Sequence, residues 1–152
     1  MLKFPRPVHL CLAHLVFLLS VGAAWADPLL THPLSIKGHV LRAEIAHTEA
    51  QRRRGLMFRE ALGEDQGMLF LYPRAGIYSM WMKNTAVPLS VAFIDERGTI
   101  LNIADMTPYS EQSHTAAGKA LYALEMAQGW FRRHRVHRGD AVRGLDRLPR
   151  AE

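Results

Sequence analysis

The clearest pattern in the chain is an alternation of apolar and polar side chains between Gly38 and Ala46. Leu41, Ala43 and Ile45 fall on one side of this segment, and charged residues fall on the other. A period of two is typical of a strand with one buried face. The run Leu89–Ile94 is apolar on both faces, which predicts a strand at a central position of a sheet.

Further short apolar runs, each bounded by turn residues, predict more strands. These runs are Met68–Tyr72, Ile77–Met82, Thr99–Ala104 and Leu121–Met126. The segment 95–98 is predicted to be a hairpin turn, and the polar segment 107–118 a long surface loop.

Two segments favour short helices. Thr48 and Gln51 form a capping-box pair that predicts a helix over Glu49–Arg54, ended by Gly55. Gly129–Arg135 is predicted to form one or two helical turns. Together the elements predict a mainly β (α+β) chain: a compact single-domain β-barrel-like fold with one or two short helices. An open sheet with a helix packed on one side is the alternative.

The amino terminus has the pattern of a cleaved signal peptide. Lys3 and Arg6 precede an apolar run, Leu10–Val21, and Ala24-Trp25-Ala26 fits a small-x-small cleavage site. The run holds about 12 residues, whereas a membrane span needs roughly 20. We therefore expect residues 1–26 to be removed, leaving no stable membrane anchor, and the protein to be exported to a periplasmic or secreted location.

After cleavage, residues 27–36 are predicted to be an extended lead-in, 37–145 a single β-rich domain and 146–152 a flexible tail. The only cysteine, Cys11, leaves with the signal peptide, so the mature chain has no disulfide and no thiol nucleophile. The loss of Lys3 and Arg6 lowers the formal net charge from +5 to +3. Because an exported protein meets little nucleic acid, this modest basic charge does not indicate nucleic-acid binding.

The region from Arg52 to Gly98 resembles a known family. Its pattern is Arg52-x-x-Gly55-Leu56-Met57-x-Arg59, Gly67-Met68-Leu69-Phe70-x-x-Pro73, Trp81-Met82-Lys83-Asn84-Thr85-x-x-Pro88-Leu89, then Phe93-Ile94 and Gly98. These residues resemble the uncharacterised family called domain of unknown function 192, and the resemblance extends over most of the chain after residue 36. It implies a family without an established reaction. Members commonly have Pro-Leu-Asp where this chain has Pro88-Leu89-Ser90. This departure favours either a structural role for position 90 or an activity that is not general to the family.

The leading candidate site is the segment Trp81-Met82-Lys83-Asn84-Thr85. Trp81 offers an aromatic platform and Lys83 a cation, while Asn84 and Thr85 offer neutral hydrogen-bonding groups. Such groups suit a small polar or anionic ligand. The structural alternative, in which they close a turn and form an ion pair, stays open. Arg54 is a further ligand-binding candidate.

Glu125 is the candidate catalytic residue. It is predicted to share a strand face with Leu121 and Ala123, so its carboxylate must be paired or have a raised pKa. The resemblance also places a Leu-Glu pair here, matched by Leu124-Glu125. A carboxylate in an apolar setting suits a general base. The alternative is a structural ion pair with Lys83, Arg54 or Arg59.

No metal site or cofactor is predicted. Met80-x-Met82 places two soft thioethers on one strand face, the kind of ligand that Cu(I) prefers, but methionines in apolar runs more often fill a core. The histidines lack the spacing of a metal motif.

Three functions remain open. The first is an exported binding or accessory protein with a polar pocket around Trp81–Thr85 and Glu125, which takes a small polar or anionic ligand or an envelope protein partner. The second is a small hydrolase or transferase with Glu125 as general base and Lys83 and Asn84 stabilising negative charge. The third is a structural envelope protein without a small-molecule site.

Overall fold

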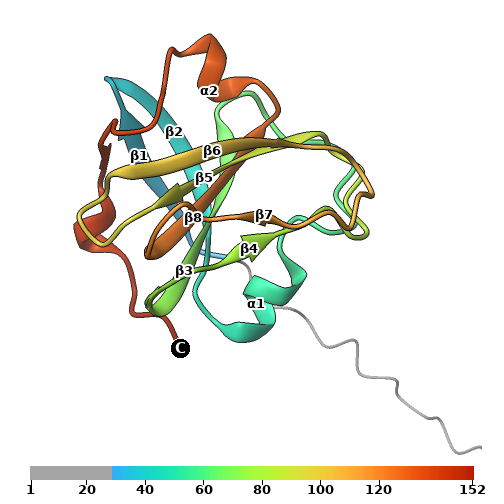
Figure 1. The fold of residues 1–152 in the computed structure, drawn as a ribbon, viewed down its shortest axis with the longest axis horizontal. Helices are drawn as coiled ribbons and strands as arrows, with labels where there is room; N and C mark the ends of the chain where they lie inside the picture. Colours follow the sequence, from blue (N-terminus) through green and yellow to red (C-terminus); the bar gives the residue numbers. More distant parts are fainter. Residues whose placement is uncertain (1–28) are drawn as a thin grey trace, which may run out of the picture.

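The computed structural model describes residues 29–152, which fold into a curled seven-stranded sheet with short helices at its margins (Figure 1). The predicted signal peptide, residues 1–26, lies outside the described residues. The strands are β1 (Thr31–Ile36), β2 (His39–Ala46), β3 (Gln66–Gly76), β4 (Ser79–Met80), β5 (Leu89–Ile94), β6 (Ile100–Met106), β7 (His114–Thr115), β8 (Ala120–Ala127) and β9 (Val142–Arg143). The helices are α1 (Glu49–Arg54) and α2 (Trp130–Arg133), with a single 3₁₀ turn, η1 (Leu145–Arg147). The prediction of a mainly β, barrel-like domain is confirmed.

The strand order of the large sheet is β6-β5-β8-β3-β2-β1-β9, and β4 and β7 form a separate two-stranded ribbon. All neighbours are antiparallel except β2 and β3, which are parallel and are connected through α1. The two ends of the sheet approach each other, because Thr99 forms a bridge with Ala141 just before β9. The amide of Val142 donates to the carbonyl of Gly98, which reinforces this contact. The sheet therefore curls most of the way to a barrel.

Both faces of the central strands are buried. On β3, Leu69 and Leu71 pack in one hydrophobic cluster, which β1 and β2 help to close. Met68 and Phe70 point the other way, into a second cluster beneath α1 and the segment 79–88. All six residues of β5 are buried, as the unbroken apolar run Leu89–Ile94 predicts.

Helix α1 has the predicted bounds and the predicted capping box. The Thr48 hydroxyl accepts from the Gln51 amide, and the Gln51 side chain accepts from the Thr48 amide. Gly55 follows the helix with φ 47°, and a Cβ there would lie only 3.2 Å from the ring of Phe70. The glycine thus lets the chain leave the helix close over β3. No helix within residues 29–152 is both long and apolar enough to cross a bilayer.

Four segments differ from the sequence expectation. The predicted lead-in, residues 27–36, contains β1, which pairs with both β2 and β9 and buries Leu34 and Ile36. Pro28 and Pro33 conceal this alternation in the sequence. The predicted strand over 77–82 is shorter in the structure, where only β4 forms. Its partner β7 lies in the segment 107–118, which was predicted to be a loop. A strand of two residues is too short to show an alternation of apolar and polar side chains.

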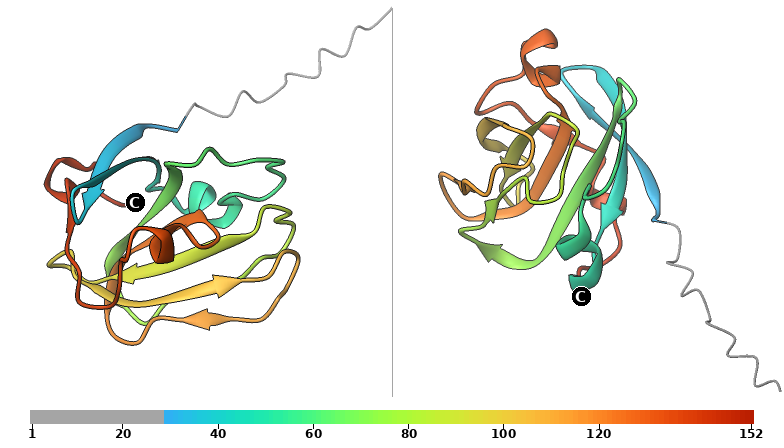
Figure 2. Two further views of the ribbon diagram at one scale, coloured as in Figure 1. Left: turned by 90° about the horizontal axis from the view of Figure 1, so that it is seen from above. Right: turned by 90° about the vertical axis from the view of Figure 1, so that its right-hand side faces the viewer.

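The C-terminal residues, predicted as a flexible tail over 146–152, return to the barrel beside α1 (Figure 2). The amide of Glu152 donates to the carbonyl of His47, and Leu148 and Ala151 pack against the cluster closed by β1 and β2. Arg52 of α1 also donates to the carbonyl of Glu152. The end of the chain therefore contacts the helix that borders the candidate site.

Candidate functional site

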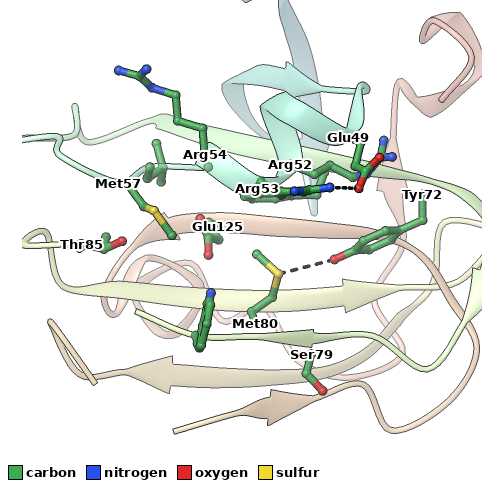
Figure 3. A pocket seen from close by; sticks show the side chains of 14 residues that line it. Glu49, Arg52, Arg53, Arg54, Met57, Tyr72, Ser79, Met80, Thr85 and Glu125 are labelled. Carbon is green, nitrogen blue, oxygen red and sulfur yellow. Dashed lines mark hydrogen bonds and ion pairs between the residues drawn. The ribbon is translucent and has the colours of Figure 1, made fainter. Parts of the chain in front are cut away.

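A cavity of about 290 Å³ lies between α1, the ribbon strand β4 and the second hydrophobic cluster (Figure 3). Segments from four parts of the chain meet here: α1 with the residues that follow it, β3, the segment 79–85, and β8. The lining residues are Glu49, Arg52, Arg53, Arg54, Gly55, Leu56, Met57, Phe70, Tyr72, Ser79, Met80, Trp81, Thr85 and Glu125.

Glu125 is the buried acid of this cavity. It lies on β8 between Met68 of β3 and Val91 of β5 in the sheet register, and only 3% of its surface is exposed. Glu125 projects from the same side of β8 as the buried Ala123, two positions earlier on the strand. Burial raises the pKa of this carboxyl from 4.5 to about 8.

Within residues 29–152, no group donates a hydrogen bond to the Glu125 carboxylate and no cation pairs with it. The basic residues expected as partners are engaged or placed elsewhere. Arg59 pairs with Glu44, and Lys83 lies 4.0 Å from Glu111. Figure 3 shows the guanidinium of Arg54 directed away from Glu125. The Glu125 oxygens are not among the fully enclosed polar atoms without a partner in residues 29–152, so they reach the cavity and are open to contact there.

Tyr72 and Met80 form the opposite wall. The Tyr72 hydroxyl donates to the Met80 sulfur over 3.4 Å, which joins the end of β3 to β4 (Figure 3). The Tyr72 ring stacks on Tyr78 with centroids 3.6 Å apart and an angle of 5° between planes. Burial, followed by the nearby charge of Glu125, raises the pKa of Tyr72, so this phenol stays neutral at physiological pH.

Helix α1 places three arginines along the cavity margin. Arg52 donates to the carbonyl oxygens of His47 and Leu71, as well as to that of Glu152. Arg53 pairs with Glu49 one turn earlier in the helix. These contacts direct both guanidinium groups at neighbouring protein groups rather than at Glu125.

Four of the six predicted site residues come together at the cavity: Trp81, Thr85, Arg54 and Glu125. Lys83 and Asn84 do not line it. The Lys83 ammonium lies 5.2 Å from the centroid of the Trp81 ring.

Asn84 is part of the turn between β4 and β5. Its φ is 53°, in the left-handed region that asparagine tolerates, and its carbonyl accepts from the Phe58 amide. The Thr85 hydroxyl donates to the Lys83 carbonyl over 3.1 Å. The predicted turn over Lys83–Thr85 therefore hydrogen-bonds to the chain that follows α1, through the Asn84 carbonyl and the Phe58 amide.

The lining residues that sequence reasoning did not single out as site residues include Tyr72, Met57 and Met80. Tyr72 closes an apolar run, and a buried tyrosine needs a partner for its hydroxyl, which was the available signal. The sequence favours a core role for Met80 and Met82 over a soft-metal site, and the structure separates the two side chains. Met82 is buried in the second hydrophobic cluster, whereas Met80 lines the cavity. Residues 29–152 contain no group of three or more histidine, cysteine or acidic side chains arranged to hold a metal ion.

Solved structures of related sequence share this fold. One is a candidate transcription regulator from Sinorhizobium meliloti 1021, 33% identical, with a TM-score of 0.74; the match covers 77% of this chain and 95% of that one. Another is a protein of unknown function from Novosphingobium aromaticivorans DSM 12444, 36% identical, with a TM-score of 0.73; the match covers 78% and 93% respectively. The model of a family described as "Uncharacterized ACR" matches residues 32–144. No curated protein matches the chain.

Proposed function

We propose that this chain, which belongs to the DUF192 family as its sequence pattern predicts, is a binding protein whose small ligand occupies the cavity over Glu125. The observation that carries this proposal is the Glu125 carboxyl itself. It is buried at the edge of a cavity and has no partner among residues 29–152.

A carboxyl in that position favours a ligand for energetic reasons. Burial without a compensating hydrogen bond or charge destabilises the folded protein. A ligand that hydrogen-bonds to Glu125 regains the missing interaction, so binding energy compensates for an unfavourable feature of the free protein. Functional sites often keep such features at the expense of stability.

The size and lining of the cavity restrict the ligand. A volume of about 290 Å³ lies at the lower limit of typical ligand pockets, so the ligand is small. Leu56, Phe70 and Met80 provide apolar wall, whereas Glu125 and Thr85 provide polar contacts. These features favour a ligand that combines an apolar body with a polar group.

A second candidate function uses the same carboxyl as a general base in a hydrolase or transferase. The specific observation in its favour is the pKa of Glu125, raised to about 8, since a base is most effective when its pKa lies near the working pH. The electrostatic helpers first expected, Lys83 and Asn84, do not line the cavity, which weakens this alternative.

A thermal-shift screen tests the binding proposal. Small organic cations, neutral molecules and anions are compared on the parent protein, on Glu125→Gln and on Glu111→Gln. Glu111 is a matched control because it is an exposed glutamate outside the cavity. We expect at least one class to raise the melting temperature of the parent and of Glu111→Gln, but not of Glu125→Gln.

Failure of every class on the parent protein contradicts the binding proposal and favours a structural envelope role. Turnover of an ester or amide in the screen that is lost in Glu125→Gln favours the general-base alternative instead.

We also propose that the protein acts after export, in the periplasm or outside the cell. The support is the pattern of basic, apolar and small residues over 1–26. Mass measurement of the protein recovered from cell envelope and medium tests this. A mass starting at or near Asp27 is expected, and an intact Met1 terminus in the membrane fraction contradicts the proposal.

A further inference from the structure

Three polar side chains of the cavity wall, those of Tyr72, Thr85 and Glu125, offer hydrogen-bond acceptors. The Tyr72 proton is directed at the Met80 sulfur, so its oxygen offers only lone pairs. The Thr85 hydroxyl proton is directed at the Lys83 carbonyl, so the Thr85 oxygen also offers only lone pairs to the cavity. The Glu125 carboxylate offers acceptor sites alone once it is ionised, above its pKa of about 8; below that pH the carboxyl also carries one donor.

Two of the donors at the cavity margin, Arg52 and Arg53, are committed elsewhere. Arg52 donates to three backbone carbonyls and Arg53 pairs with Glu49. Figure 3 shows Arg54 extending away from Glu125. The Trp81 indole N–H also lines the cavity, but it is a single donor beside the three acceptors of Glu125, Tyr72 and Thr85. These acceptors suit a group that brings its own donors.

The walls favour a positive charge as well. Aromatic faces attract cations through their quadrupole, and Trp81 already has the Lys83 ammonium 5.2 Å from its ring centroid. Phe70 and Tyr72 add aromatic surface to the same cavity, and Met57 and Met80 add polarisable sulfur.

We propose that the cavity binds a small primary ammonium compound, with the ammonium group at Glu125 and an apolar or aromatic body along the methionine and aromatic wall. This inference rests on the proposed binding function and adds the chemical class of the ligand. An ammonium group carries three donors and no acceptor, which complements the acceptors of Glu125, Tyr72 and Thr85.

The helix α1 restricts the ligand further. Arg52, Arg53 and Arg54 place three positive charges along the margin of the cavity. A second ammonium group on the ligand would lie nearer to these charges, so a monoamine is favoured over a diamine of the same length.

Titration calorimetry with three probes of matched shape tests the proposal: phenethylamine, phenethyl alcohol and phenylacetate. We expect phenethylamine to bind the parent protein about tenfold or more tightly than either other probe, since hydrogen bonds to a charged group are the stronger ones. Glu125→Gln is expected to lose this preference, and Glu111→Gln to keep it. Tyr72→Phe and Thr85→Val, which each remove one acceptor, are expected to weaken phenethylamine more than phenethyl alcohol.

The outcomes separate this inference from the binding proposal on which it rests. Tighter binding of the alcohol or the phenylacetate, lost in Glu125→Gln, supports a ligand site and overturns the ammonium class. Binding of phenethylamine that is unchanged in a folded Glu125→Gln also overturns the ammonium contact. If no probe binds but the wider screen finds a Glu125-dependent ligand of another class, the ammonium inference fails alone; if that screen is also empty, both fail.

Discussion

The hydroxyl of Ser90 on β5 donates a 2.5 Å hydrogen bond to the carboxylate of Asp105, its register partner on β6. The same hydroxyl accepts from the Gly129 amide over 3.0 Å, at the turn before α2. Ser90 is 1% exposed, so its hydroxyl connects β5 to β6 and to the turn before α2 inside the domain. Position 90, where the family pattern commonly has aspartate, has a structural role in this chain.

The first prediction concerns Ser90→Ala. Removing the hydroxyl leaves the buried Gly129 amide without its acceptor, so the free energy of unfolding is expected to fall by about 1–3 kcal/mol. Denaturant melts measure the change. The control is Ser79→Ala, since Ser79 hydrogen-bonds to Thr115 at an exposed position and its loss should change stability little.

Ser90→Asp tests the contact between Ser90 and Asp105 by adding a charge instead of removing the hydroxyl. Two carboxylates would then face each other across β5 and β6, and this repulsion should destabilise the protein more at pH 7 than at pH 4. Adding Asp105→Asn should recover part of the loss. Equal stability of Ser90→Asp and the parent at pH 7 would show that Arg132, 3.5 Å from Asp105, accommodates the second charge.

The second prediction follows from the pKa of Glu125, which is 4.5 unperturbed and about 8 in the folded protein. The folded state therefore keeps its proton to a higher pH than the unfolded chain does. The stability that the neutral carboxyl contributes is fully present below pH 4.5 and is lost as pH rises to about 8. Glu125→Gln has no such titration. The stability of this variant relative to the parent should rise by on the order of 3 kcal/mol between pH 5 and pH 8.

Urea melts of both proteins at several pH values provide the measurement. Glu111→Gln serves as the control, because this exposed glutamate should not change the slope of stability with pH. Marked destabilisation of Glu125→Gln at pH 8 would mean that the carboxylate has a cationic partner in solution, which contradicts the unpaired site.

Much of the fold follows from local signals in the sequence. The capping box of Thr48 and Gln51 determines where α1 begins. Its hydrogen bonds lie within four consecutive residues, so the sequence shows it directly. The unbroken apolar run of β5 reflects burial on both faces. The position of Glu125 on an apolar face follows from the period of two in β8, because register and alternation fix a side chain's direction.

The cavity depends on contacts that no local pattern contains. Tyr72 and Met80 are close in sequence, but their bond needs the bend that separates β3 from β4. Lys83 and Asn84 follow Trp81 directly, yet the turn directs them away from the cavity while Thr85 returns to it. Sequence proximity therefore predicted the right segment and did not separate its lining residues from its turn residues.

The third prediction concerns Arg52, which joins α1 to β3 and to the C-terminal residues through the carbonyls of His47, Leu71 and Glu152. Lysine cannot reproduce the geometry of a guanidinium that donates to three acceptors. Arg52→Lys is therefore expected to lower the free energy of unfolding by about 1–3 kcal/mol. Arg53→Lys, one position later and exposed, is the matched control and should have little effect. Equal effects in thermal melts would contradict a specific role for the contacts of Arg52.

The last prediction concerns how the affinity for phenethylamine depends on pH. Glu125 must be ionised to attract an ammonium group, and its pKa is about 8 in the free protein. Tyr72 faces the same cavity but stays neutral, because burial raises its pKa, and the arginines of α1 lie at the cavity margin. The amine itself remains protonated until roughly pH 10, as an alkylammonium does. Affinity should therefore increase about tenfold per unit between pH 6 and pH 7, and level off above pH 8.

Calorimetry of the parent and of Glu125→Gln across this range measures the effect. The variant is expected to show weak binding with no dependence on pH between 6 and 8, because the titrating group is absent. An affinity that falls as pH rises would show that the ligand accepts a hydrogen bond from the protonated carboxyl. The site would then select an acceptor such as a carbonyl or carboxylate, and the ammonium class would be wrong even though Glu125 remains the group that recognises the ligand.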